Sequence, residues 1–283
     1  MSDRRVTPAN GRVAAAHLQG IVAADAFVVG TPQDIVAALT DLRAQPGGNR
    51  DRQLLLGAAV TVFERRAGWA FVQADADGYV GYVEEAALGP RTTPSFRVAT
   101  AATHAYETES FKSRDVMALS FGSRVTVVDE RPKMYETPYG FIPKKHLRPL
   151  DRSFKDPVTV AQLFFGTPYL WGGNSRWGID CSGLIQAALQ ACGQFCPGDS
   201  DLQMAEVGQD LPADAPFQRG DLLFWKGHVG IMVDNDVMLH SNAHAMSTVY
   251  EPIKDAMIRI KAQGDGEIVA RKRLGSGTHN ASP

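Results

Sequence analysis

The chain has 283 residues, of which 44% are apolar and 21% charged, a composition typical of a soluble globular protein and unlike that of a disordered one. Its 29 Lys and Arg residues against 31 Asp and Glu give a formal net charge of −2, which argues against nucleic acid as the main partner because no basic excess can neutralise phosphates. The length predicts two or three domains of about 100–150 residues.

The sequence carries no sign of a membrane or export segment. No run reaches the roughly 20 apolar residues that span a bilayer, and the N-terminus MSDRRVTPANGR has no apolar stretch behind its arginines. The three cysteines, Cys181, Cys192 and Cys196, are too few for a disulfide framework. We therefore expect no membrane partner, a reducing environment and a cytoplasmic location.

Residues 1–50 are predicted to form an N-terminal arm followed by a helical segment. The first 20 residues are polar and lack a clear period. In the range 31–43, Thr31 precedes Pro32 as an N-cap precedes the first helical position. Four apolar residues then recur at helical spacing, namely Ile35, Val36, Leu39 and Leu42.

Two stretches of short strands follow, at 51–90 and 91–150. In the first, Gly and Asp residues open the runs WAFVQ and YVGYV at short intervals, which is typical of a small β-barrel. The second repeats the order of a glycine, a V-x-V strand, a charged turn and an aromatic strand. We interpret the two stretches as a diverged internal repeat that forms two small barrels.

The remaining segment, 151–283, carries the reactive residues. Cys181 comes just before an apolar helical face in LIQAALQAC, and Gly193 follows as a C-terminal cap. Because the N-terminus of a helix favours an anion, we predict a lowered thiol pKa and a reactive thiolate at Cys181. The alternative is that Cys181 is a small buried core residue, the common state of free cysteines.

Two histidines lie on consecutive predicted strands further along the chain. The runs GDLLFW, GHVGIMV and VMLHS are typical of short strands, with a turn at 234–236. His228 and His240 would therefore lie side by side across a hairpin. One imidazole can act as general base to a thiol, and the other can orient the first.

Together these features resemble the NlpC/P60 family of cell-wall cysteine peptidases, which have a papain-like α+β fold. The resemblance implies that Cys181 is the nucleophile and His228 the general base. It further implies that His240 orients the base and that Tyr169 helps to hold the oxyanion. The two β stretches resemble bacterial SH3-like (SH3b) domains. The residues that carry the resemblance to the peptidase family are Tyr169 twelve residues before Cys181, D-C-S-G at 180–183, G-D-L-L-F-W at 220–225, G-H-V-G-I at 227–231 and L-H-S at 239–241.

A narrower resemblance concerns the murein-recycling members of that family. In those members an Asp-Ser pair, with the serine after the nucleophile, lines a pocket for the free amine of an N-terminal L-alanine. The resemblance implies this substrate-binding role for Asp199, Ser200 and Ser182. It also implies that a tyrosine of the first SH3b domain, Tyr79 or Tyr82, closes the pocket. A carboxylate that faces an ammonium group would reject stems still linked to glycan.

The chain departs from this pattern at two positions, and several residues have simpler interpretations. Gly198 stands where an arginine is expected, and Ala58 where some relatives have an acidic residue. Asp199 could be the N-cap of the following helical segment, and both tyrosines could be ordinary barrel aromatics. Cys192 and Cys196 are interpreted as structural, because the sequence suggests no further metal ligands near them.

The sequence therefore predicts an α+β protein with a papain-like NlpC/P60 domain after two small SH3-like β-barrels. The expected boundaries are 1–50, 51–90, 91–150 and 151–283. By resemblance, the expected reaction is hydrolysis of the γ-D-glutamyl–L-diamino-acid bond in a peptidoglycan-derived peptide with a free N-terminal L-Ala, which releases L-Ala-γ-D-Glu. We expect no cofactor, no metal and no nucleic-acid or membrane partner, and the oligomeric state stays open.

Three alternatives remain at this point. The first is a wall-acting D,L-endopeptidase with the same chemistry on intact peptidoglycan. The second is a non-catalytic protein that uses its SH3b domains to hold peptide, against which the complete Cys, His, His set argues. The third is an acyltransferase or amidase on another γ-glutamyl substrate, because the same nucleophile supports acyl transfer.

Overall fold

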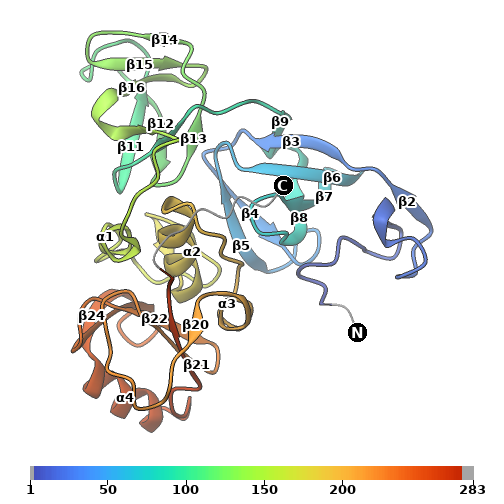
Figure 1. Cartoon of the computed structure of the whole chain (residues 1–283). Coiled ribbons are helices and arrows are strands. Elements are labelled where there is room, and N and C mark those ends of the chain that lie inside the picture. The colour runs from blue at the N-terminus through green and yellow to red at the C-terminus, as the bar shows by residue number, and fades with distance from the viewer. Residues whose placement is uncertain (1–2, 276–283) are drawn as a thin grey trace. The chain divides into compact units, whose positions relative to one another are not determined.

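The computed structural model describes residues 3–275, and within them the chain forms two compact units that meet between Arg152 and Ser153 in the sequence. The first unit, coloured from blue to yellow-green in Figure 1, consists almost wholly of strands, and the second combines helices with a sheet. Within residues 3–275 no helix has both the length and the apolar character needed to cross a membrane. The last eight residues of the predicted range 151–283 lie outside the described residues.

The N-terminal arm packs against the first group of strands. It contains the parallel pair β1 (Val13–Ala15) and β2 (Ala26–Val28), with the 3₁₀ turn η1 (Ala16–Leu18) between them. Arg12 forms an ion pair with Glu64 at 2.6 Å, and the N–H of Val80 donates to the carbonyl of Arg5 at 2.7 Å. These contacts hold the polar N-terminal residues in a defined structure, a question that the sequence alone left open.

A seven-stranded sheet follows the arm, with the order β5-β4-β8-β7-β6-β3-β9. It consists of β3 (Thr31–Ile35), β4 (Leu39–Arg43), β5 (Arg50–Leu55), β6 (Ala59–Arg66), β7 (Trp69–Ala74), β8 (Val80–Glu84) and β9 (Leu88–Pro90), with the 3₁₀ turn η2 (Glu85–Ala87). The antiparallel neighbours alternate side chains between a common core and the outside.

The helix predicted over 31–43 is wrong, because this segment forms β3 and β4. Ile35 and Leu42 are fully buried, but they enter the same core from two different strands. The spacing that indicated one helical face thus arises from two strand ends joined by a short connection. Long-range pairing decides the outcome, because β3 lies between β6 and β9 in the sheet. The first β group therefore begins at Thr31 and not at residue 51.

Residues 96–149 form two smaller sheets, with the orders β13-β10-β17 and β12-β11-β16-β15-β14. A separate core includes Val98, Ala105, Leu119 and Ile142. Like the first group, this one ends on a 3₁₀ turn and a short strand. That it is a second SH3-like barrel stays a prediction. The elements are β10 (Phe96–Val98), β11 (Ala102–Tyr106), β12 (Asp115–Ser120), β13 (Arg124–Val125), β14 (Asp129–Glu130), β15 (Met134–Thr137), β16 (Gly140–Pro143), η3 (Lys144–His146) and β17 (Leu147–Pro149).

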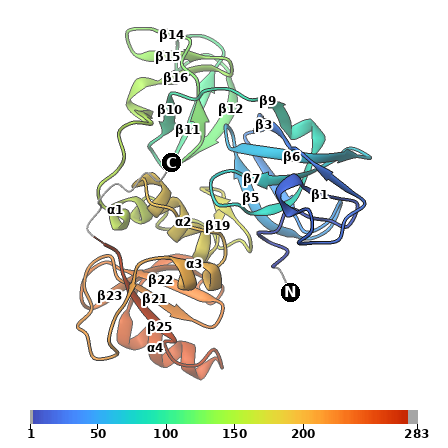
Figure 2. The same ribbon diagram turned by 45° about the vertical axis from the view of Figure 1, so that its right-hand side comes forward.

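The second unit is built on a six-stranded sheet with the order β20-β25-β21-β22-β23-β24. Helices α2 and α4 lie on opposite sides of this sheet (Figures 1 and 2). The elements are α1 (Pro157–Gln162), β18 (Asn174–Ser175), β19 (Gly178–Ile179), α2 (Cys181–Ala191), α3 (Ser200–Glu206), β20 (Gln209–Asp210), β21 (Leu222–Trp225), β22 (His228–Met232), β23 (Val237–Asn242), β24 (Ser247–Pro252), α4 (Ile253–Ala262) and β25 (Ala270–Arg273).

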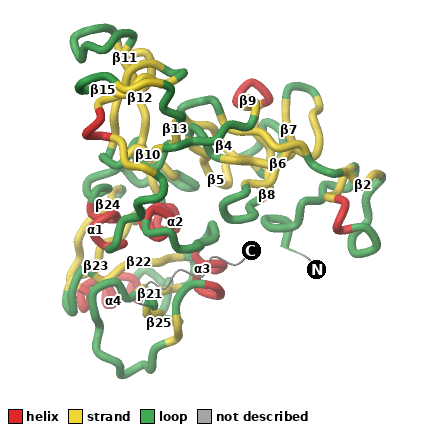
Figure 3. The backbone as a smooth tube through the Cα atoms, turned by 45° about the horizontal axis from the view of Figure 1, so that its top comes forward, coloured by secondary structure: helices red, strands yellow, loops and turns green. Residues whose placement is uncertain are grey.

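Apolar packing holds the helices of this unit on the sheet. The buried face of α2 includes Leu184, Ile185 and Leu189 and packs against β22 and β23. On the other side, Ile253 and Ile260 of α4 join a core with residues of β21 to β23. The tube in Figure 3 shows α2 next to β22, with which it is in contact. The N–H of Val229 in β22 faces Cys181, the first residue of α2. This arrangement brings the N-terminus of α2 to the strand that begins at His228.

Candidate active site

The carboxylate of Asp180 caps the helix that carries Cys181. Its Oδ1 accepts the N–H of Gly183 at 2.6 Å and the hydroxyl of Ser182 at 3.0 Å, while Oδ2 accepts the N–H of Gly172 at 2.9 Å. A β-carbon on Gly183 would lie 2.4 Å from the carbonyl oxygen of Gly173. The D-C-S-G motif thus supplies a capping carboxylate and the small residue that lets the 172–173 loop approach the helix.

Burial decides the protonation state of the Cys181 thiol. The side chain is 8% exposed, and burial together with the Asp180 carboxylate raises the thiol pKa to about 12. The N–H groups of Val229 and Ser182 oppose this shift without reversing it. The predicted lowering of the pKa is therefore wrong, because it counted the field of the helix terminus and omitted desolvation. A neutral thiol needs a base to become a nucleophile.

The two predicted histidines meet as expected across the hairpin of β22 and β23. Nε2 of His228 lies 2.9 Å from Nδ1 of His240, and the ring centroids are 5.1 Å apart. Burial lowers the pKa of His228 to about 3, and the neighbouring His240 and Arg259 act in the same direction. Burial also lowers the pKa of the fully buried His240. Both imidazoles are therefore neutral near pH 7.

The strand that begins with the partly exposed His228 and the loop that contains Tyr169 both approach the N-terminus of α2. The N–H of Val229, next to His228, faces the sulfur. A parallel bridge between Tyr169 and Ile179 places the tyrosine beside the loop that leads into Cys181. Burial and the charges of Cys181 and Asp180 raise the pKa of Tyr169, so its hydroxyl keeps its proton and can donate a hydrogen bond.

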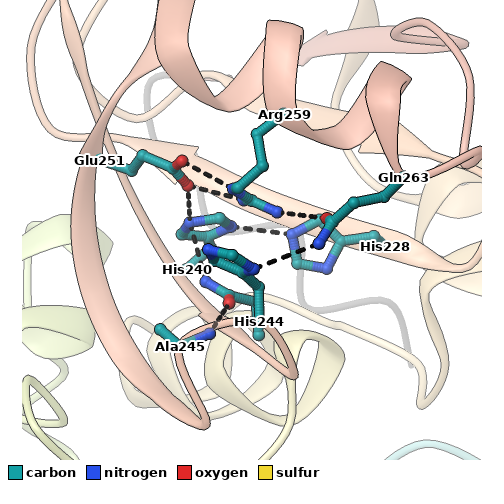
Figure 4. Close-up of polar contacts among 8 residues, drawn as sticks. His228, His240, His244, Ala245, Glu251, Arg259 and Gln263 are labelled. Atoms are coloured by element: carbon teal, nitrogen blue, oxygen red, sulfur yellow. Dashed lines mark hydrogen bonds and ion pairs between the residues drawn. The ribbon is translucent and has the colours of Figure 1, made fainter.

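Three residues that the sequence analysis missed belong to the polar network of His240, and Figure 4 labels two of them, Glu251 and Arg259. Glu251 Oε2 lies 2.9 Å from His240 Nε2, and Asn242 Nδ2 lies 3.0 Å from the same nitrogen. Arg259 binds both oxygens of Glu251, at 2.8 and 2.7 Å. The sequence signal for Glu251 was its place in the strand that follows the predicted hairpin. Glu251 pairs with Met238, which is two residues from His240 in β23, so Glu251 and His240 lie on the same face of the sheet.

The predicted substrate-binding residues of this unit lie in two linked segments. Ser182 is buried near the start of α2, and Ser200 is the buried first residue of α3. Gln203 of α3 ties the segments together, because its Nε2 donates to the carbonyl of Ser182 at 2.9 Å. Asp199 stands at the N-cap position with φ 56° and ψ 140°. That backbone conformation is costly for a non-glycine residue and is characteristic of functional sites.

Tyr79 and Tyr82 belong to the first unit. Tyr79 lies in its core, and the guanidinium carbon of Arg52 is 5.6 Å from the centre of its ring. Tyr82 packs on Phe71, with ring centroids 5.1 Å apart. Both are therefore barrel aromatics in the described structure, and a role of either in closing a substrate pocket stays a prediction.

The arrangement in the second unit is suited to acyl transfer. A neutral thiol lies against the strand that begins with a neutral imidazole, and Nε2 of that imidazole contacts a second imidazole. Such a pair can generate a nucleophile by proton transfer at the moment of attack. Across residues 3–275, no group of three or more His, Cys, Asp or Glu side chains is arranged to hold a metal ion.

Comparison with known proteins identifies two domains in the chain. Residues 166–262 match the NlpC/P60 family, and residues 42–88 match the bacterial dipeptidyl-peptidase SH3 domain. The gamma-D-glutamyl-L-lysine dipeptidyl-peptidase of Bacillus subtilis is 29% identical over 216 residues, which cover 67% of this chain and 71% of the relative. The protein of the same name from Bacillus cereus is 26% identical over 224 residues, covering 68% and 67%.

Solved structures show the fold as well. An NlpC/P60 family protein from Bacillus cereus matches with a TM-score of 0.72 and 21% identity, over 86% of this chain and 99% of that one. The SH3 match lies in the first unit and the NlpC/P60 match in the second unit, as the order of strands and helices described above requires. The chain therefore contains a domain of the NlpC/P60 family at residues 166–262 and a bacterial SH3 domain at residues 42–88, and the relatives that it matches are named as peptidases.

Proposed function

We propose that this protein is a cysteine peptidase that hydrolyses the γ-D-glutamyl–L-diamino-acid bond of peptidoglycan-derived peptides with a free N-terminal L-Ala, releasing L-Ala-γ-D-Glu. The observation that carries the proposal is the position of Cys181 at the N-terminus of α2, against the strand that begins with the hydrogen-bonded His228. The printed name of the two Bacillus relatives, gamma-D-glutamyl-L-lysine dipeptidyl-peptidase, supports the choice of bond.

The reaction begins with transfer of the thiol proton to His228 as the sulfur attacks the scissile carbonyl carbon. Because Nε2 of His228 contacts His240, Nδ1 is the nitrogen that takes this proton. Hydrogen bonding from Tyr169 stabilises the oxyanion of the tetrahedral intermediate. The intermediate then collapses, the carbon–nitrogen bond breaks, and the imidazolium returns the proton to the leaving amine.

The second half of the reaction regenerates the thiol. A water molecule gives a proton to Nδ1 of His228 and attacks the thioester carbonyl carbon. When the carbon–sulfur bond breaks, the imidazolium protonates the departing sulfur of Cys181. The balance is one water consumed for each peptide bond hydrolysed, with the new carboxyl group on the D-glutamyl residue.

Recognition of the amine is the finer part of the proposal. The strained backbone of Asp199 and its place beside Ser200 and the Ser182 segment support a site in which its carboxylate receives the ammonium group of L-Ala. In intact peptidoglycan that nitrogen is part of an amide bond. A strict need for the free amine therefore favours released peptides, and with them a role in recycling inside the cell.

Two experiments test the reaction and the specificity separately. Mass spectrometry of products from L-Ala-γ-D-Glu-L-Lys should show L-Ala-γ-D-Glu and free lysine, and Cys181→Ala should abolish both products while its circular dichroism spectrum stays unchanged. Cleavage by the Cys181→Ala variant would rule out the thiol mechanism. Equal cleavage of the N-acetylated tripeptide would rule out the amine site, and release of peptides from intact sacculi would favour a wall-acting endopeptidase.

A further inference from the structure

The polar network behind His228 extends to a helix on the far side of the hairpin (Figure 4). His228 Nε2 contacts His240 Nδ1, and His240 Nε2 contacts Glu251 Oε2, both at 2.9 Å. Arg259 of α4 binds the two oxygens of Glu251. Because His240 has no solvent exposure, each of its ring nitrogens must find its hydrogen-bond partner inside this network.

Two side chains compete for the Nε2 atom of His240. Asn242 accepts the N–H of Ala245 with its Oδ1 at 2.8 Å, so its Nδ2 points donor hydrogens at Nε2 from 3.0 Å. This contact favours an Nε2 without a proton. The carboxylate of Glu251 can only accept, and it favours an Nε2 that carries the proton. Charge-assisted hydrogen bonds are roughly twice as strong as neutral ones, so Glu251 prevails.

The outcome at His240 fixes the tautomer of His228. With its proton on Nε2, a neutral His240 has a lone pair on Nδ1, and it accepts the Nε2–H of His228. The lone pair of His228 then lies on Nδ1, the nitrogen left for the proton of Cys181. We propose that Glu251, held by Arg259, is a positioning residue that sets both tautomers and so keeps His228 able to act as a base. The inference rests on the proposed thiol mechanism.

Loss of the Glu251 carboxylate should move the ring proton from Nε2 to Nδ1 in both His240 and His228. In Glu251→Gln, Arg259 can only donate, so it captures the amide oxygen and turns the amide nitrogen toward His240. Nε2 of His240 then faces two donors and loses its proton to Nδ1. His240 donates to Nε2 of His228, which must carry its own proton on Nδ1, where it cannot accept another from the thiol.

The decisive variant moves the carboxylate to the other side of the same nitrogen. Asn242→Asp is nearly isosteric, still accepts the N–H of Ala245, and presents an acceptor to Nε2. The double variant Glu251→Gln with Asn242→Asp should therefore restore the tautomers, whereas a purely structural role of Glu251 would not be rescued this way. Glu267→Gln is the matched control, because Glu267 is an exposed carboxylate that also pairs with a basic residue of α4, Lys261.

Two measurements on the full chain read out the proposal. Long-range ¹H–¹⁵N NMR of the histidine rings should show His228 and His240 protonated on Nε2 in the wild type, on Nδ1 in Glu251→Gln, and on Nε2 again in the double variant. With the tripeptide as substrate, Glu251→Gln should lose between about 10² and 10⁴-fold in kcat with little change in KM, and the double variant should regain most of it.

The outcomes separate this inference from the proposed function. An Nδ1 proton on His240 in the wild type, or a Glu251→Gln variant with the tautomers of the wild type, would overturn the inference. So would a double variant that is as inactive as the single one while Glu267→Gln is fully active. If the wild type does not cleave the tripeptide, the proposed function fails, whereas the NMR spectra still decide the role of Glu251.

Discussion

Replacing Asp180 with asparagine should weaken the fold of the catalytic unit and, at the same time, make its thiol more acidic. The asparagine oxygen can still accept from Gly183 and Ser182, but its amide nitrogen meets the N–H of Gly172, which Asp180 accepts at 2.9 Å. An orphaned buried N–H costs about 1–3 kcal/mol, and two charge-assisted bonds weaken by about 1 kcal/mol each. Relief of the buried charge offsets part of this, which leaves a loss of about 2–4 kcal/mol.

The second effect has the opposite sign for reactivity. The Asp180 carboxylate is, after burial, the next cause that raises the pKa of Cys181, so its removal should lower that pKa. A drop of one pKa unit would increase the thiolate fraction, and the alkylation rate near pH 8, about tenfold. Urea unfolding gives the stability, and iodoacetamide labelling of Cys181, followed by peptide mass spectrometry across pH, gives the thiol pKa.

A matched control separates these two effects. Asp156 caps α1 in the same way, by accepting the N–H of Val158 at 3.0 Å, but it is not among the groups that shift the pKa of Cys181. Asp156→Asn should cost about 1 kcal/mol and leave the labelling profile of Cys181 unchanged. A Cys181 labelling profile in Asp180→Asn that is unshifted, or shifted to higher pH, would refute the electrostatic reasoning.

Three further predictions concern the same unit. Tyr169→Phe should lower kcat about 10² to 10³-fold with KM nearly constant, and an unchanged kcat would exclude its hydroxyl from oxyanion binding. Gly183→Ala should reduce the free energy of unfolding by about 1–3 kcal/mol in urea titrations, because the new Cβ meets the Gly173 carbonyl; an unaltered midpoint would contradict this. The pKa of His228 is about 3 in the folded protein, so below pH 6.5 this residue binds a proton in the unfolded chain but not in the folded one. The free energy of unfolding of the wild type should therefore fall toward pH 4. His228→Asn should lose less over that window, and parallel curves for the two proteins would count against the lowered pKa.

Local sequence patterns predicted the catalytic segment well. The apolar helical face that follows Cys181 predicted a helix starting there, and the paired strands around 234–236 follow from turn residues between short apolar runs. The same local reasoning failed at 31–43, where apolar residues at helical spacing come from the two strands β3 and β4. Only the pairing of β3 with β6 and β9, which are distant in sequence, distinguishes the two outcomes.

The pKa values and the supporting contacts of the site were harder to predict than the identity of its nucleophile and its two histidines. The helix terminus at Cys181 indicated a lowered pKa, but the thiol is surrounded by protein, and desolvation outweighs the field of one helix end. Glu251 escaped notice because its contact with His240 depends on the register of β23 and β24, in which Met238 faces Glu251. Neither burial nor strand register can be read from the spacing of motif residues.

Arg259 has a role in the network that differs from holding Glu251 in place. Without the nearby positive charge of Arg259, a carboxylate beside His240 would favour an imidazolium with protons on both nitrogens. Its Nδ1–H would then donate to His228, and the base would hold its proton toward the thiol. The positive charge of Arg259 balances Glu251 and lowers the pKa of His240, on which burial acts in the same direction. The site thus starts with neutral imidazoles and a neutral thiol, so the proton that the leaving amine needs is the one that Cys181 gives up on attack.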